Sequence, residues 1–163
     1  MDKKRILYVL LGLVAIVGMI LGVDFWQRQQ AAVLAPANMP PGSIPIFMDG
    51  KFVASFVPDD LTLLENASFV DSEEGKTQEG WLLRDVILLY IKENKLKDNT
   101  QVTVSSSSRE KSQSLTWAEV TLVNNMVMFD VSGRGTLKLV SKIPGFDLRD
   151  LWIQDVDKIE VVR

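Results

Sequence analysis

The sequence predicts an α+β fold in which a mixed, mostly antiparallel sheet surrounds one central helix, and it predicts one transmembrane helix before this domain. Three observations favour this fold class. A long apolar run lies near the N-terminus, several short stretches alternate between apolar and polar residues, and one stretch in the middle repeats its apolar residues at helical spacing. The expected strands and helices do not alternate regularly, which indicates α+β rather than a parallel α/β sheet.

The apolar run, Ile6–Val23, has no polar interruption. At ~1.5 Å per residue it spans ~27 Å as a helix, which is close to the hydrocarbon thickness of a bilayer. The basic cluster Lys3–Arg5 precedes the run and Asp24 follows it. The positive-inside rule therefore predicts a cytoplasmic N-terminus, a single pass through the cell (inner) membrane and an extracytoplasmic C-terminal domain.

A cleaved signal peptide is the alternative interpretation of this run. The small residues of Ala35–Ala37 resemble a cleavage site, but they lie too far beyond Val23 for a peptidase at the membrane face. We therefore expect residues 1–26 to form an uncleaved signal anchor. Residues 27–43 follow as a tether whose last part is rich in proline, which favours an extended spacer. The folded domain is expected at residues 44–163.

The domain is expected to begin with a hairpin, because an Asp-Gly pair separates the apolar stretches Ile44–Met48 and Lys51–Val57. A short helical turn is predicted over Pro58–Leu64, which has acidic residues near its start. Phe69–Ser72 is predicted as a short strand, and the polar stretch Ser72–Gly80 as a loop.

The stretch Gly80–Asn94 is predicted to form the central helix. Its apolar residues at helical spacing are Leu83, Val86, Ile87, Tyr90 and Ile91. The charged residues Arg84 and Asp85 fall on the other side. Leu82, Leu88 and Leu89 widen the apolar stripe, so we expect strands and loops to cover this helix on more than one side.

The remaining elements are shorter. A capping box at Thr116–Glu119 predicts the start of a brief helix. A tight turn is expected at Gly133–Gly135, another turn at Ile143–Phe146, and a polar loop at Ser105–Ser114. The predicted strands are Gln101–Ser105, Met126–Val131, Thr136–Val140, a short piece at Trp152–Ile153, and Lys158–Val162.

Composition excludes several classes of function. The chain has no cysteine and no histidine, so it lacks thiolate metal ligands, a cysteine nucleophile and the commonest general base. Its net charge is −3, and the first basic cluster with Asp2 contributes +2, so the rest of the chain carries −5. An acidic domain is poorly suited to phosphate backbones, and we therefore expect no nucleic-acid partner.

The order of these elements resembles the molybdopterin-binding domain of the sulfite-oxidase-like oxidoreductases, in a small single-domain form. The similarity covers roughly residues 46–163. Its most specific parts are the stretch Gly80–Ile87 and the closing Trp152–Val161. The other matching stretches are the Asp49–Gly50 hairpin, Asp60–Leu61, Val102–Ser105, Leu115–Glu119 and Gly133–Val140. The resemblance implies a mixed α+β fold with a mostly antiparallel sheet.

In the catalytic members of that family, a cysteine thiolate binds molybdenum, and histidine with arginine helps to hold the pterin phosphate. This chain has neither cysteine nor histidine. The segment that the resemblance places near the cofactor reads Ser-Ser-Ser-Ser-Arg-Glu-Lys here, and serine is an unusual substitute because it is a hard, weakly acidic oxygen ligand. We therefore expect no cofactor and no metal, and the function must be argued separately from the fold.

The candidate residues for binding a partner or ligand come from the surface that holds the cofactor in the sulfite-oxidase-like family, as the resemblance implies. They are Ser105, Ser106, Ser107, Ser108, Arg109, Arg134, Arg149 and Trp152. Arginine and tryptophan are frequent among residues that dominate interfaces, although a core position is an alternative for the tryptophan. The acid pairs Asp59–Asp60 and Glu73–Glu74 are interpreted as solvated surface rather than metal ligands.

These observations favour a non-catalytic accessory module that is anchored in the membrane and binds a protein partner in the same membrane. Two alternatives stay open. One is a molybdopterin-dependent oxidoreductase with an altered cofactor site. The other is a small-molecule sensor that uses the old cofactor cleft.

Overall fold

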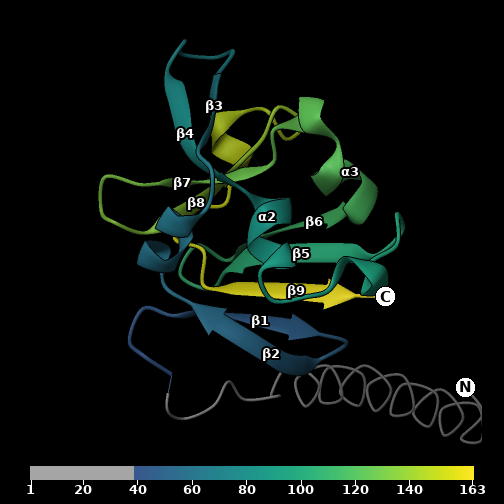
Figure 1. The fold of residues 1–163 in the computed structure, drawn as a ribbon. Coiled ribbons are helices and arrows are strands. Elements are labelled where there is room, and N and C mark those ends of the chain that lie inside the picture. The colour runs from purple at the N-terminus through teal and green to yellow at the C-terminus, as the bar shows by residue number, and fades with distance from the viewer. Residues whose placement is uncertain (1–38) are drawn as a thin grey trace, which may run out of the picture. The chain divides into compact units, whose positions relative to one another are not determined.

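The computed structural model describes residues 39–163, which belong to one compact unit (Figure 1). The predicted anchor and most of the predicted tether therefore lie outside the described residues. Within residues 39–163, no helix combines the length and the apolar character needed to cross a membrane.

The domain contains short strands and shorter helices. The strands are β1 (Ile44–Met48), β2 (Lys51–Phe56), β3 (Ala67–Val70), β4 (Thr77–Leu82), β5 (Gln101–Ser106), β6 (Lys111–Thr116), β7 (Met128–Val131), β8 (Leu137–Val140) and β9 (Lys158–Val162). The α-helices are α2 (Leu83–Leu88) and α3 (Trp117–Thr121). The 3-10 helices are η1 (Pro58–Leu63), η2 (Glu93–Lys95), η3 (Val123–Asn125) and η4 (Arg149–Leu151).

The strands form two sheets. The five-stranded sheet has the order β2-β1-β9-β5-β6, and the four-stranded sheet has the order β3-β4-β7-β8. Every pairing is antiparallel except that of β1 with β9, which brings the first and last strands of the domain side by side (Figure 1). The predicted α+β fold with mostly antiparallel pairing is confirmed, but the strands form two sheets and not the single sheet that was predicted.

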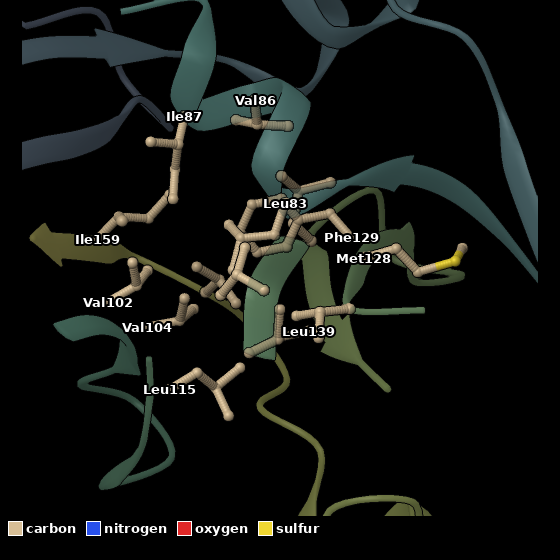
Figure 2. Close-up of a cluster of buried hydrophobic side chains, with 14 of the residues drawn as sticks. Leu83, Val86, Ile87, Val102, Val104, Leu115, Met128, Phe129, Leu139 and Ile159 are labelled. Atoms are coloured by element: carbon tan, nitrogen blue, oxygen red, sulfur yellow. The ribbon is translucent and has the colours of Figure 1, made fainter. Parts of the chain in front are cut away.

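The core lies where α2 meets both sheets. Leu83, Val86 and Ile87 are completely buried on one face of α2. Figure 2 shows Ile87 near Ile159 of the five-stranded sheet and Leu83 near Phe129 of the four-stranded sheet. The helical spacing read from the sequence therefore identified the buried face, and the prediction that this helix is central is confirmed.

The helix is shorter than the predicted Gly80–Asn94. Its first predicted residues extend β4 instead, because Gly80, Trp81 and Leu82 pair with β7. At the other end, the Ile91 amide donates to the Ile87 carbonyl and closes one further turn. The backbone has an extended conformation at Lys92, so the helix does not continue to Asn94. Pairing with a neighbouring strand supplies the backbone hydrogen bonds that a longer helix would otherwise have made.

The prediction of a loop over Ser72–Gly80 is also wrong in its second half. Thr77–Gly80 pairs with β3, and its polar Gln78 is buried. The Gln78 amide nitrogen donates to Asp71 at 3.0 Å, and the Lys138 ammonium donates to its oxygen at 2.7 Å. The sequence shows only a polar stretch there, and one of these partners, Lys138, is distant in the chain.

Other local predictions are confirmed. Asp49 and Gly50 both adopt left-handed backbone angles, as the turn of a two-residue hairpin requires. Thr116 caps α3, with its hydroxyl accepting from the Glu119 amide and its own amide donating to the Glu119 carboxylate. Ile153 forms an isolated bridge with Leu139, which extends the β8 edge by the short strand piece that the sequence predicts.

Candidate functional site

Two turns that are far apart in sequence meet at one carboxylate. Arg109, in the β5–β6 turn, donates from Nε to Asp155 at 2.7 Å. Arg134, in the β7–β8 turn, donates from Nη2 to both oxygens of the same carboxylate at 3.1 Å. The Thr136 hydroxyl donates to it at 2.7 Å. We call these four residues the Asp155 cluster, and it brings two of the predicted arginines together.

The chain presents Asp155 to the two turns through an unusual backbone conformation. Asp155 has a φ of 54°, a left-handed value that aspartate tolerates better than most residues. The Thr136 hydroxyl bond is the largest cause that holds the pKa of Asp155 below its usual value, and Arg109 and Arg134 act in the same direction against partial burial. The lowered pKa favours the ionised carboxylate, which forms ion pairs with both guanidinium groups.

The predicted serines are ordered parts of the fold. Ser105 and Ser106 belong to β5 and pair with β6, so the predicted polar loop shrinks to the turn that follows them. Ser106 is buried, and its hydroxyl lies 3.2 Å from that of Ser108. The Ser107 amide donates to the Asp157 carboxylate at 2.7 Å. Of the four serines, Ser107 and Ser108 are exposed.

An open cavity of about 660 Å³ lies beside the Asp155 cluster. Its polar groups come mainly from Ser108, Thr136, Asp155 and Asp157, and its apolar wall includes Ile44, Val57, Pro58, Leu137 and Val156. Neither Arg109 nor Arg134 lines it. The cavity therefore presents hydroxyl and carboxylate oxygens, and it does not present the cationic surface that the sequence led us to expect.

Arg149 and Trp152 lie in a second cluster with different partners. Arg149 Nη1 contacts Asp71 at 3.2 Å and Glu74 at 3.0 Å. Trp152 is only 3% exposed, and the cations of Arg149 and Lys138 each lie 5.6 Å from the centre of its ring. Trp152 therefore occupies a core position, which was the alternative to a binding role, because its indole packs inside the domain and does not lie on the surface.

In this second cluster, Asp71, Glu73 and Glu74 of the β3–β4 loop contact Arg149 of η4. The Glu73 carboxylate accepts from the Arg149 amide at 3.0 Å, and the Asp71 carboxylate accepts from the amides of Glu73 and Glu74. The bond from the Glu74 amide is the largest cause that lowers the pKa of Asp71, ahead of Gln78 and Arg149 and against its burial. These ion pairs and hydrogen bonds are structural contacts between segments distant in sequence.

The other polar motifs are also used by the fold. The Asp60 carboxylate accepts from the Val57 amide at 2.9 Å, and Glu73 and Glu74 are engaged as described. The Gly135 amide donates to the Ser132 carbonyl and the Arg134 amide to the Ser132 hydroxyl, so two of the three amides of this turn already have partners within it. Across residues 39–163, no three acidic side chains are grouped closely enough to hold a metal ion.

The lowered pKa of Asp155 predicts a loss of stability in acid. A carboxyl whose folded-state pKa lies below its unfolded value near 4 stabilises the fold above that value, and this stabilisation disappears as pH falls through the folded-state pKa. The free energy of unfolding should be level from pH 7 to about pH 5 and decline below about pH 4. Asp155→Asn should be less stable than the wild type at pH 7, and the difference should shrink in acid. Urea unfolding followed by tryptophan fluorescence measures both, and a difference that stays constant down to about pH 3 would contradict the prediction.

A different surface feature was not recognised as a site in the sequence. Leu63 is 88% exposed and Leu89 47% exposed, and with Leu64 and Leu88 they line an open groove of about 470 Å³ between η1 and α2. We call these four residues the leucine groove. The expectation that Leu88 and Leu89 are covered is therefore wrong. The signal was present in the widened apolar stripe of the helix, which marks a free surface here rather than a second buried flank.

Comparison with known proteins does not assign the chain to a family. No protein-family description matches it, and no curated protein matches it. The resemblance to the sulfite-oxidase-like domains therefore stays a prediction, and the geometry of the described residues has to support any functional proposal.

Proposed function

We propose that the chain is a non-catalytic docking module, anchored in the cell membrane by Ile6–Val23, whose extracytoplasmic domain binds a protein of the same membrane complex. The observation that carries this proposal is the leucine groove. Large apolar side chains scattered singly over a surface are common, whereas four that share one hollow are typical of interaction sites.

The groove offers binding energy that the polar clusters do not. Burying an exposed leucine side chain contributes about 1.5–3 kcal/mol, and Leu63 has nearly all of its surface available. By contrast, Arg109 and Arg134 already form ion pairs with Asp155 at 2.7 and 3.1 Å. A partner that used these arginines would first have to break those contacts, so the groove is the better candidate for the main contact.

The anchor and tether add a further reason for an interaction with a neighbour. A tether that follows a membrane anchor restricts the volume that the domain explores, which raises its effective concentration for a protein in the same membrane. A modest groove is then sufficient for stable association, because the second contact is effectively intramolecular.

Replacing two groove leucines is expected to release the partner. Leu63→Gln with Leu89→Gln keeps side-chain size but places amides where the partner buries apolar surface, so recovery of the co-purified protein should fall at least tenfold. The full chain should be isolated from gently solubilised native membranes, and its melting temperature should stay nearly unchanged because both sites are exposed.

Leu122→Gln is the matched control, since Leu122 is 56% exposed but lies on the α3 side of the domain and not in the groove. It should leave co-purification intact. Equal recovery from the control and from the double variant would show that the groove does not carry the interaction.

The cavity beside the Asp155 cluster supports a second candidate function. Its volume of about 660 Å³ is within the range of small-molecule sites, and its hydroxyl and carboxylate oxygens suit a ligand that donates hydrogen bonds. A sensor of this kind is favoured if the double variant in the groove leaves every co-purified protein in place.

A further inference from the structure

We propose that the leucine groove receives a basic amphipathic helix of the partner protein, and this inference rests on the proposed docking function. Three properties of the groove carry it: the shape of its walls, the absence of a sheet edge along it, and the charge of its border.

The walls come from two short helical segments. Leu63 and Leu64 lie at the C-terminal end of η1, and Leu88 and Leu89 at the C-terminal end of α2, so an occupant meets apolar side chains from both segments. This is the geometry in which an amphipathic helix lays one apolar face between two walls, with side chains three and four residues apart entering the groove.

The occupant must satisfy its own backbone hydrogen bonds. The outer strands of the two sheets in residues 39–163 are β2, β6, β3 and β8, and none of these strands lines the groove. An extended peptide in the groove would therefore have no strand to pair with, and its buried amides would lose their bonds to water. A helix satisfies those groups internally, and for that reason it fits the groove better than a strand.

The border of the groove is acidic. Glu65 and Asp85 line it together with Arg84, whose Nε donates to Asp85 at 3.1 Å. The Glu65 carboxylate is exposed and has no ion-pair partner among the described residues. Asp60 lies three residues before Leu63 on η1, and residues three apart share one side of a 3-10 helix. Arg84 and Asp85 compensate each other, so the charges of Glu65 and Asp60 remain, and these favour a positively charged partner.

Two other occupants fit this border less well. A second copy of the chain would place the same carboxylates opposite each other, which is repulsive. A bilayer with anionic headgroups would meet the same repulsion, although it could accept the leucines. A partner helix with leucine-sized residues on one face and lysine or arginine beside them satisfies both the walls and the border.

A photo-crosslinking residue in place of Leu89 tests the proposal in the full chain and in native membranes. After irradiation, mass spectrometry identifies the peptide that is joined to the probe. We expect a segment of another protein that has helical apolar spacing and at least two basic residues. The same probe at Leu122, outside the groove, reports background labelling.

The charge of the border is tested in the same preparation. Glu65→Lys should lower the crosslink yield from Leu89 about threefold or more, because it replaces an attractive contact by a repulsive one, and Glu65→Gln should have a smaller effect. Neither change should alter the melting temperature, since the Glu65 side chain is exposed.

The possible adducts separate this inference from the proposed function. An adduct with a partner segment that lacks basic residues, or a yield that rises with Glu65→Lys, overturns the inference but leaves a docking module. An adduct with lipid or with a second copy of the chain would show that this molecule, and not a partner helix, occupies the groove. Labelling no stronger than the Leu122 background overturns both proposals.

Discussion

Ile87→Asp is expected to abolish the stable fold of the domain. Ile87 is completely buried on α2, and Figure 2 shows its side chain near Ile159 in a cluster of buried hydrophobic side chains. Burial of an unpaired charge costs several kcal/mol, and this is comparable to the whole stability of a small domain. We therefore expect a loss of about 4 kcal/mol or more in the free energy of unfolding.

Urea unfolding of the full chain, followed by tryptophan fluorescence, measures this loss, because Trp81, Trp117 and Trp152 are buried in the domain. Leu88→Asp is the matched control. It introduces the same charge one residue later, at a side chain that is 37% exposed, and its effect should stay below about 1 kcal/mol. An Ile87→Asp variant with the midpoint of the parent would show that α2 does not organise the core.

The elements that sequence reasoning identified correctly are those determined by neighbouring residues. The Asp49–Gly50 hairpin depends on two left-handed residues in a row, and the α3 start depends on a capping box within four residues. The buried face of α2 follows from helical spacing alone. Each of these signals is complete within a short window of the chain.

The errors have a common physical cause, which is strand pairing that the local pattern does not show. Leu82 was assigned to the helix although it belongs to a strand, because its partner Met128 is far along the chain. Thr77–Gly80 was assigned to a loop because it is polar, although it forms a hairpin with the nearby β3. A stretch with weak local preference takes the conformation that satisfies its backbone, and that choice is made by the partner strand.

The candidate binding residues show the same limit. Sequence reasoning placed Arg109 and Arg134 on one side of the domain, and the structure brings them together. It did not foresee that Asp155 would engage both, since a left-handed aspartate in an irregular segment has no sequence signature. The surface that is free to bind, the leucine groove, was hidden in a stripe that also contained the core residues of α2.

Among replacements of a glycine by alanine within residues 39–163, Gly80→Ala is expected to cause the largest loss of stability. A Cβ atom at Gly80 would lie 1.8 Å from the carbonyl oxygen of Phe129, which belongs to the backbone of β7. A side chain can turn away from such a contact, but a strand backbone cannot, so β4 must separate from β7. We expect a loss of about 3 kcal/mol or more in the free energy of unfolding.

The strand cannot relieve this contact by shifting alone, because Gly80 pairs with Ala67 of β3 on one side and with Asp130 of β7 on the other. Leu83, which begins α2, also donates its amide to the Val127 carbonyl next to β7, so a displaced β4 pulls the core helix with it. Gly133→Ala is the matched control: a Cβ there meets no atom within 4 Å, and its stability should change by less than about 0.5 kcal/mol. Both variants are compared by urea unfolding of the full chain. If Gly80→Ala unfolded at the same urea concentration as Gly133→Ala, the close approach of β4 and β7 at this residue would be wrong.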